Sequence, residues 1–377
     1  MAQPTTGLQL RSKVTPGGEL ELSLVDTPIP ELKADQVLVR IEGASLNPSD
    51  IGMMFGPADI AAVKRSGTPD HPVLTAPIPP QALQGLAARF DVSMPVGNEG
   101  AGVVVAAGAD AQALIGKTVA GFGGAMYAQY KVLKAADVLQ VGPDATPAQA
   151  ASCFVNPLTA LGMVGTMRLE GHTALVHTAA ASNLGQMLQR ICLKDGIDLV
   201  NVVRSPAQAR ILADIGAKYV VDTSAPTFLD DLNRALTETG ATIAFDAIGG
   251  GPLAAQLLTG MEIAAKAKMG GFSAYGSTTH KQVYIYGGLN TAPTELPRTF
   301  GMYWGLGGFL LTPFMQRVGP AEVERLRQRV ADELTTTFAS HYKAEISLAD
   351  VLRPEIVADY ARRATGEKYL INPNKGL

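Results

Sequence analysis

The sequence has few cysteines and few charges. Its 377 residues include only two cysteines, Cys153 and Cys192. Two cysteines allow neither a disulfide framework nor a zinc lobe built from four thiolates. Charged residues make up 17% of the chain, against an average of about 25%. Hydrophobic residues make up 47%, which excludes an intrinsically disordered chain.

An excess of basic residues and a long apolar run are also missing. The 31 basic and 34 acidic residues give a net charge of −3, which argues against nucleic-acid binding. The uncharged stretch 299–316 contains four glycines and Pro313, so we expect a buried strand and an interface rather than a membrane span. The first residues show no basic-then-apolar signal pattern. We therefore expect a cytoplasmic enzyme with reduced thiols and no membrane or nucleic-acid partner.

The length predicts two or three domains, and the first 150 residues read as β-rich. Alternating and β-branched segments predict strands at 37–41, 102–106, 118–122 and 127–133. Between 56 and 96 this pattern is lost among seven prolines, with one short helix expected at 81–89. A long irregular segment inside a compact domain is typically a functional loop or a disordered one.

The second half alternates strands and helices. Thr146-Pro147 predicts a helix start, with helical spacing over 148–167. Further helices are expected at 184–194, from Ser205 onward and at 321–336, and strands at 173–177, 199–203, 219–221, 243–245, 268–273 and 283–286. This alternation predicts a parallel, doubly wound sheet, and the tail 369–371 has strand character that returns it to the first domain.

The segment 177–185 follows a buried strand and opens a helix, the place where a dinucleotide pyrophosphate binds. Ala180, Ser182 and Gly185 occupy the three positions of the G-x-G-x-x-G fingerprint, so two of its glycines are replaced. The next strand ends at Arg204. An arginine there favours NADP, because a forked cation can bind the 2′-phosphate. A plain strand–helix turn with a solvated arginine is the alternative.

Several ordered pieces resemble one known family. They are Asn47-Pro48-Ser49-Asp50, Gly97-Asn98-Glu99-Gly100-Ala101-Gly102, Val155-Asn156-Pro157-Leu158-Thr159-Ala160, Ala181-Ser182-Asn183-Leu184-Gly185-Gln186 and Asn201-Val202-Val203-Arg204. Together they resemble the zinc-independent medium-chain dehydrogenase/reductase family, in its quinone oxidoreductase and enoyl-thioester reductase branch. The resemblance implies an α/β protein with a GroES-like β-rich catalytic domain (1–150 and 318–377, with an insertion at 57–95). A Rossmann cofactor-binding domain (151–317) with a doubly wound parallel sheet would complete it.

The resemblance also implies which residues meet the cofactor and that no metal is bound. Zinc-dependent relatives bind metal where this sequence has Asn47, Asn98 and Val155, which are poor zinc ligands. The expected NADPH contacts are Asn156, Thr159, Ala181, Ser182, Asn183, Leu184, Arg204, Ser205, Ala247, Ile248, Gly249, Tyr275, Gly276, Ser277, Phe309, Leu310, Leu311 and Lys368. Tyr275–Ser277 are in this set because they follow the segment 268–273, which is predicted to be the fifth strand. Each could instead be an ordinary loop or core residue.

Without a metal, hydride transfer suits an electron-poor acceptor such as a quinone or another α,β-unsaturated carbonyl. Asn47 and Asn98 are candidates to hydrogen-bond the acceptor oxygen. The family's enoyl-thioester reductases use a tyrosine where this sequence has Ala58, so Tyr127, Tyr130 or Tyr275 would have to donate the proton. A quinone could take it from water. A 2-enoyl-thioester reductase and a weakly catalytic NADPH-binding protein of crystallin type remain alternatives.

Two expectations concern surfaces. The insertion begins directly after Asn47–Asp50, so we expect it to border the substrate cleft as a proline-stiffened wall. Residues 283–286 are expected to form the final strand of the Rossmann sheet, beside the apolar run 300–314. An exposed edge strand next to apolar surface predicts a homodimer whose interface includes this strand and residues 304–309.

Overall fold

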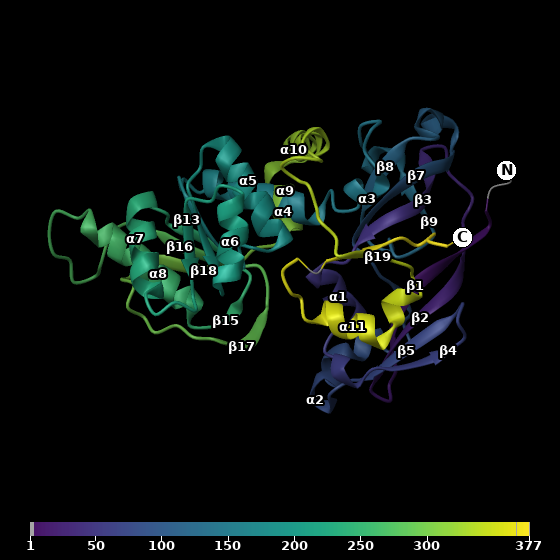
Figure 1. Cartoon of the computed structure of the whole chain (residues 1–377), viewed down its shortest axis with the longest axis horizontal. Helices are drawn as coiled ribbons and strands as arrows, with labels where there is room; N and C mark the ends of the chain where they lie inside the picture. Colours follow the sequence, from purple (N-terminus) through teal and green to yellow (C-terminus); the bar gives the residue numbers. More distant parts are fainter. Residues whose placement is uncertain (1–3, 367, 377) are drawn as a thin grey trace. The chain divides into compact units, whose positions relative to one another are not determined.

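The computed structural model describes residues 4–366 and 368–376. The chain forms two compact units, Met1–Val155 with Arg327–Leu377 and Asn156–Leu326 (Figure 1). The predicted division lay at 150/151 and 317/318. The chain returns to the first unit at 326/327, which is inside helix α10 (Pro320–Asp332) rather than before it.

The first unit is β-rich. One sheet has the strand order β4-β5-β2-β1-β6, and the other has β10-β8-β7-β3-β20-β19 with β9 paired to β3. The strands are β1 (Thr6–Val14), β2 (Glu19–Pro28), β3 (Gln36–Ser45), β4 (Lys64–Gly67), β5 (Pro72–Pro77), β6 (Met94–Pro95), β7 (Glu99–Ala107), β8 (Thr118–Phe122), β9 (Tyr130–Lys134), β10 (Leu139–Gln140), β19 (Ala344–Ile346) and β20 (Tyr369–Ile371). The predicted strands at 37–41, 102–106 and 118–122 are confirmed, and that at 127–133 begins three residues later.

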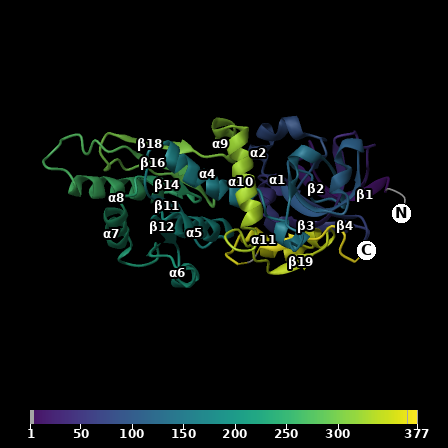
Figure 2. The ribbon, with the colours of Figure 1, turned by 90° about the horizontal axis from the view of Figure 1, so that it is seen from above.

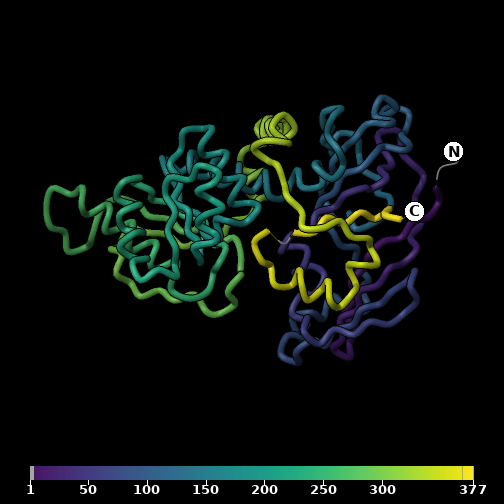
Figure 3. The backbone as a smooth tube through the Cα atoms, viewed as in Figure 1, coloured from purple at the N-terminus to yellow at the C-terminus, as the bar shows by residue number. Residues whose placement is uncertain are grey.

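Strand β2 shows why these segments form sheets. Its leucines Leu20, Leu22 and Leu24 alternate with more exposed residues and enter the core, as a half-buried strand requires. The tail returns as predicted: β20 pairs antiparallel with β3 and parallel with β19. Figure 3 shows this yellow segment running among the N-terminal strands.

The insertion is more regular than the sequence indicated. Its strand β5 pairs antiparallel with β2, β4 pairs with β5, and β6 pairs with β1. The short helix expected at 81–89 is present as α2 (Pro80–Leu83) and the 3₁₀ helix η2 (Gln84–Arg89). The segment therefore extends an existing sheet, and the prolines Pro72 and Pro77 lie at the two ends of β5.

Short helices complete the first unit. They are α1 (Pro48–Phe55), η1 (Ile60–Ala62), η3 (Ala109–Leu114), η4 (Ala135–Asp137), α3 (Pro147–Ala150), η5 (Asp350–Leu352) and α11 (Pro354–Ala361). Thr146 caps α3 by accepting a hydrogen bond from the Gln149 amide, and Gln149 reciprocates. The helix predicted over 148–167 is two helices, because the chain leaves helical geometry between α3 and α4 (Val155–Leu169).

The second unit contains a parallel sheet of order β13-β12-β11-β14-β16-β18. The strands are β11 (Leu175–Thr178), β12 (Leu199–Val203), β13 (Tyr219–Asp222), β14 (Ile243–Asp246), β16 (Lys281–Ile285) and β18 (Trp304–Gly308), and β15 (Gly249–Gly251) pairs separately with β17 (Asn290–Thr294). Numbered along the chain, the order is 3-2-1-4-5-6, the Rossmann arrangement. Every residue of β12 is buried, as expected for a strand covered on both faces.

Helices cover this sheet. They are α4, α5 (Asn183–Asp195), α6 (Pro206–Asp214), α7 (Phe228–Thr239), α8 (Leu253–Ala267) and α9 (Leu311–Val318). Helices α7 and α8 lie side by side on one face (Figure 2), where Leu232, Leu257 and Val283 share a core cluster. Helix α6 packs Leu212 against Val203 in a separate cluster. No helix in the described ranges is long and apolar enough to cross a membrane.

One predicted strand is absent, and another is present but not at the predicted edge of the sheet. Residues 268–273 form turns and irregular chain, so β16 is the fifth strand, and it lies between β14 and β18 instead of at the edge. The edge strand is β18, inside the segment expected to be a buried strand and interface; its side chains are half-buried to exposed. Trp304, Gly305, Leu306 and two further glycines make a weak strand pattern, so the sequence did not show that this strand is the edge of the parallel sheet.

Candidate functional site

The turn between β11 and α5 brings the altered fingerprint together. Ser182 is the N-cap of α5, and its hydroxyl accepts a hydrogen bond from the Gly185 amide (3.1 Å). A Cβ on Gly185 would lie 2.1 Å from the Ala180 carbonyl oxygen, so this position requires glycine. Ala179 adopts a positive φ of 50°. The small residues keep the turn tight, and the first-turn amides of α5 point out of the helix end.

Arg204 lies at the carboxyl end of the neighbouring strand. It is exposed, and its backbone amide donates to Gln208 Oε1 (3.1 Å). None of the side-chain bonds found within the described ranges involves its guanidinium. Ser205 caps α6 by accepting from the Gln208 amide (3.3 Å), which leaves its own hydroxyl hydrogen available to donate.

Strand β14 ends at a buried carboxylate that fixes the next loop. Asp246 Oδ1 accepts hydrogen bonds from the Thr178 hydroxyl (2.6 Å) and the Ile248 amide (2.9 Å). Its Oδ2 accepts from the Gly249 amide (3.1 Å). Thr178 is the last residue of β11, so the two strand ends at the topological switch point are directly linked.

A second link lies beside it. His177 Nε2 and the Tyr286 hydroxyl are 2.7 Å apart, and their rings stack. Burial lowers the pKa of His177 to about 3, so the imidazole is neutral at pH 7. His177 Nδ1 is buried without a hydrogen-bond partner in the described structure.

Other predicted cofactor residues occupy α4 and the segment after β18. Asn156 and Thr159 are on the first turn of α4, three residues apart and therefore on one face. Phe309 is half-buried, with its ring packed edge-on against Phe245 (5.2 Å between centroids). Leu310 is 67% exposed and precedes α9, and Leu311 begins that helix.

Tyr275, Gly276 and Ser277 were expected after the fifth strand, and that placement is wrong. They precede β16, so they lie at the amino end of the parallel sheet, opposite the β11–α5 turn. Ser277 there donates its amide (2.8 Å) and hydroxyl (2.6 Å) to Glu262. The segment that does follow the fifth strand is Tyr286–Leu289, which the sequence reading missed because it took 268–273 as a strand.

The first unit contains a buried polar cluster around Glu99. Its Oε1 accepts from Ser45 (2.8 Å), Asn47 (2.8 Å) and Ser152 (3.3 Å). Its Oε2 accepts from the amides of Phe154 and Val155, both at 2.9 Å. The carboxylate thus has five donors and caps the N-terminus of α4.

Two ionisable groups lie close to this carboxylate. Burial raises the pKa of Asp50 to about 7, although the Asn47 and Asn98 amides that bind it favour the charged form. Lys368 donates to Ser152 Oγ (2.9 Å). Burial lowers the pKa of Lys368 to about 8, and the charges of Glu99 and Asp50 limit that shift.

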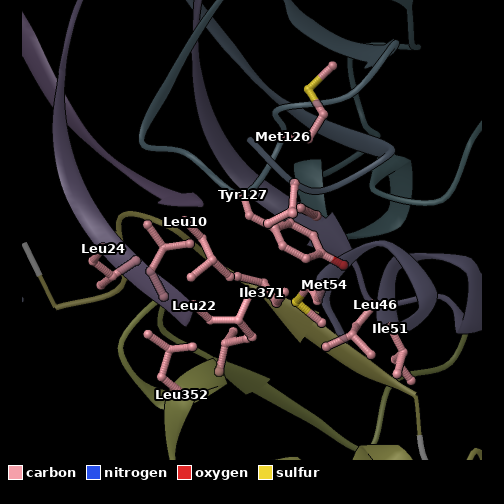
Figure 4. Close-up of a cluster of buried hydrophobic side chains, with 14 of the residues drawn as sticks. Leu10, Leu22, Leu24, Leu46, Ile51, Met54, Met126, Tyr127, Leu352 and Ile371 are labelled. Carbon is pink, nitrogen blue, oxygen red and sulfur yellow. The ribbon is translucent and has the colours of Figure 1, made fainter. Parts of the chain in front are cut away.

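The predicted catalytic residues differ in their freedom. Tyr127 is fully buried among apolar side chains (Figure 4), and its hydroxyl donates to the Ser45 carbonyl (3.0 Å). Burial raises its pKa well above the usual value, which disfavours release of its proton. Its role as proton donor stays a prediction. Asn47 commits its amide hydrogens to Ser45 and Glu99. Asn98 is only half-buried, and its side chain donates to Ser49 (3.1 Å).

The sequence reading missed the residues that hold these sites in shape. Thr178, Asp246 and Glu99 are buried polar side chains at strand ends. Thr178 and Glu99 lay inside motifs noted from the sequence, and the resemblance implied that Asp246 borders the nicotinamide ribose, but none was expected to hold a site in shape. A buried acid beside a small-residue turn was the available signal. Their partners are up to 69 residues away in the chain, which no local pattern indicates.

The second unit has the chemistry that NADPH requires. A helix N-terminus suits the pyrophosphate, and the cation at the end of β12 suits a 2′-phosphate. The absence of a side chain at Gly185 lets the backbone approach Ala180 closely, where a Cβ would collide. For a metal the fit is poor: within residues 4–366 and 368–376, no group of three or more His, Cys, Asp or Glu side chains could hold an ion.

Comparisons with solved structures agree with this architecture. A protein provisionally named NADPH:quinone reductase from Mesorhizobium loti shares 24% identity and a TM-score of 0.73, over 99% of this chain and 100% of that one. A Pseudomonas syringae quinone oxidoreductase shares 18% identity and a TM-score of 0.67, over 97% of this chain and 100% of the other. This chain has their fold. Etr1p, in a complex with NADP and crotonyl-CoA, shares 18% identity and a TM-score of 0.65, over 97% and 99% of the two chains. No model of a known protein family matches the sequence.

Proposed function

We propose that this protein is an NADPH-dependent, zinc-free oxidoreductase that reduces a quinone or another α,β-unsaturated carbonyl. The observation that carries the proposal is Arg204. It ends the second strand of a Rossmann sheet, exposed, where an NAD-specific site would have an acid. The similarity of fold to NADPH:quinone reductases supports the same cofactor.

Each part of the second unit has a task in this proposal. When bound, NADPH supplies a hydride to the acceptor. The first-turn amides of α5 hold the pyrophosphate, and Arg204 with Ser205 holds the 2′-phosphate. Asn156, Thr159 and Phe309 orient the nicotinamide end. In the first unit, Lys368 stays a proposed cofactor contact, and the nearby Glu99 and Asp50 favour its charged form.

The proposed class of hydride acceptor depends on the residues that this chain has where zinc-dependent relatives bind their metal. Asn47, Asn98 and Val155 provide no thiolate or imidazole, so a substrate that already stabilises the incoming negative charge is favoured. Asn98 is the better candidate to bind the acceptor oxygen, because Asn47 has both amide hydrogens committed. With Tyr127 in the core, water is the proposed proton source for a quinone.

A 2-enoyl-thioester reductase is the second candidate, favoured by the similarity of fold to the protein solved with NADP and crotonyl-CoA. Against it, the tyrosine position of such reductases is Ala58 here, a residue that is 8% exposed. A weakly catalytic NADPH-binding protein of crystallin type is the third.

One experiment separates the three. NADPH binding is followed by fluorescence, and a quinone or an enoyl thioester is then added. Turnover with the quinone supports the proposal, turnover only with the thioester supports the second candidate, and binding without turnover supports the third. Activity that is lost on chelation and restored by zinc would contradict the zinc-free assignment.

We also propose a cytoplasmic homodimer with no membrane or nucleic-acid partner. The exposed edge of the sheet is β18, so the interface is expected along 304–309 and no longer along 283–286. Light scattering should give twice 39.4 kDa at micromolar concentration. The insertion 57–95 stays a proposed wall of the substrate site.

A further inference from the structure

The loop after β14 has its backbone donors occupied inside the chain. The Ala247 amide donates to Thr178 Oγ1 (2.8 Å), the Ile248 and Gly249 amides donate to Asp246, and the Gly250 amide donates to the Ile248 carbonyl (3.0 Å). Thr178 and Asp246 are 0% and 1% exposed. The family resemblance implies that this loop borders the nicotinamide ribose.

Its backbone acceptors are occupied as well. The carbonyls of Ala247, Ile248 and Gly251 accept from the amides of Leu289 (3.1 Å), Asn290 (2.9 Å) and Glu295 (3.0 Å). The Gly249 carbonyl accepts from the Thr294 hydroxyl (2.8 Å). The approach is close, since a Cβ on Gly250 would lie 2.4 Å from the Ala292 carbonyl oxygen. The segment 287–295 therefore holds the loop from the other side.

These bonds leave the loop few free hydrogen-bonding groups. Ala247 and Gly249 are buried and Ile248 is half-buried, so contact with a ligand would be made chiefly through Ile248. Contact of this kind depends on where the backbone lies, because dispersion contacts weaken within a fraction of an ångström to an ångström of separation. Asp246 and Thr178 are the two buried side chains that bind the first three amides of the loop. They therefore fix the position of its backbone relative to the ends of β11 and β14.

On the basis of the proposed function, we infer that Asp246 and Thr178 are positioning residues that fix the 247–249 loop for the nicotinamide half of NADPH. They act through the loop and not by touching the cofactor. The adenine half, with its 2′-phosphate, belongs to the β12 end at Arg204. The two halves of the cofactor should therefore respond differently when the Asp246–Thr178 pair is broken.

The test compares two ligands, NADPH and adenosine 2′,5′-bisphosphate, by calorimetry. The second ligand carries the 2′-phosphate and lacks the nicotinamide. In Asp246→Asn a side-chain NH₂ must face at least one backbone amide that now donates to a carboxylate oxygen. Thr178→Val removes the hydroxyl at nearly constant shape. Each variant should weaken NADPH about tenfold, equal to about 1.4 kcal/mol or one lost hydrogen bond, and leave the bisphosphate within about twofold.

Two controls make the result specific. Thr178→Ser keeps the hydroxyl and should restore NADPH affinity. Glu262→Gln changes a buried carboxylate of the same unit at the amino end of the sheet and should spare both ligands. If Asp246→Asn does not fold, Thr178→Val carries the test, because it leaves the buried charge in place.

Unchanged NADPH affinity in folded Thr178→Val would overturn the inference, as would an equal loss for both ligands. If the unaltered protein bound neither ligand, the proposed function would fail first and this inference with it. If it bound both and the variants did not discriminate between them, only the positioning role would fail.

Discussion

Each end of the parallel sheet has a buried carboxylate, but the two carboxylates have different hydrogen-bond donors. At the amino end, Glu262 Oε2 accepts from Lys281 Nζ (2.6 Å), and that ammonium also donates to Ser277 (3.1 Å) and the Thr279 carbonyl (2.9 Å). At the carboxyl end, the donors to Asp246 among the described residues are neutral, and Arg204, which follows β12, is exposed.

The difference separates a stabilising network from a site. The amino-end ion pair has a donor for each acceptor and leaves no group for a ligand, so its effect is on folding. The carboxyl end combines a rigid loop with an outward cation and a helix N-terminus, which are what an anionic cofactor needs. Substitutions at the first end should change stability, and substitutions at the second should change binding.

The largest effect is expected at the amino end, for Lys281→Met. Lys281 is 0% exposed, and its removal leaves Glu262 buried with Lys266 (3.6 Å) as its one remaining cation among the described residues. Breaking a buried pair by removing one partner costs about 3–5 kcal/mol, so urea denaturation should show a loss of at least about 3 kcal/mol. The double variant with Glu262→Gln should recover part of it. If the folded variant also lost NADPH affinity by a similar free energy, the amino end could not be a purely stabilising end of the sheet.

The next effect is expected at the carboxyl end, for Arg204→Ala. A charge-assisted hydrogen bond to a phosphate contributes about 1.5–3 kcal/mol, so NADPH should bind roughly tenfold to a hundredfold more weakly. NADH affinity and the urea midpoint should be nearly unchanged, since Arg204 is exposed. Titration calorimetry with both cofactors measures this. An equal loss for NADPH and NADH would contradict the assignment of the 2′-phosphate to Arg204.

The carboxyl end was largely predictable from the sequence. Strand β12 has the predicted bounds, and the turn at Ser182 and the arginine at 204 are local signals that need no distant partner. The β-rich first half and the returning tail were predictable for the same reason, because alternation and β-branching are local.

The amino end was not predictable. Lys281 opens the fifth strand, and a lysine there reads as solvated chain unless Glu262, 19 residues away, is known to pair with it. The preceding 268–273 was taken as the strand instead, which moved Tyr275–Ser277 to the wrong end. The burial of Tyr127 was unpredictable for a similar reason, since it depends on strands from across the first unit.

A smaller effect, of pH, is expected from His177. Its pKa is lowered to about 3 by burial, whereas an unfolded histidine titrates near 6.5. Between these two pKa values the imidazole is protonated in the unfolded state and neutral in the folded state. The free energy of unfolding therefore decreases as pH falls from about 6.5 toward 3. The loss should reach about 2 kcal/mol at pH 5 relative to pH 7.

Comparison with His177→Gln isolates this contribution, because Asp50 and Lys368 titrate in both proteins. The variant should lose less stability between pH 7 and pH 5 in urea denaturation. Equal pH slopes in the two proteins would show that the imidazole is protonated in the fold, and that the His177–Tyr286 pair is open to solvent.

The smallest effect is expected for Tyr275→Ala, and it tests the comparison most directly. Tyr275 is one of the expected NADPH contacts, but it lies before β16 at the amino end and is 77% exposed. Its hydroxyl is outside the Glu262–Lys281 network, so truncation should leave the unfolding free energy within about 0.5 kcal/mol. NADPH affinity should also stay within about twofold, an energy of less than about 0.5 kcal/mol. A tenfold weakening of NADPH in this variant would mean that the cofactor reaches the amino end, and the division of the sheet into a stabilising end and a binding end would be wrong.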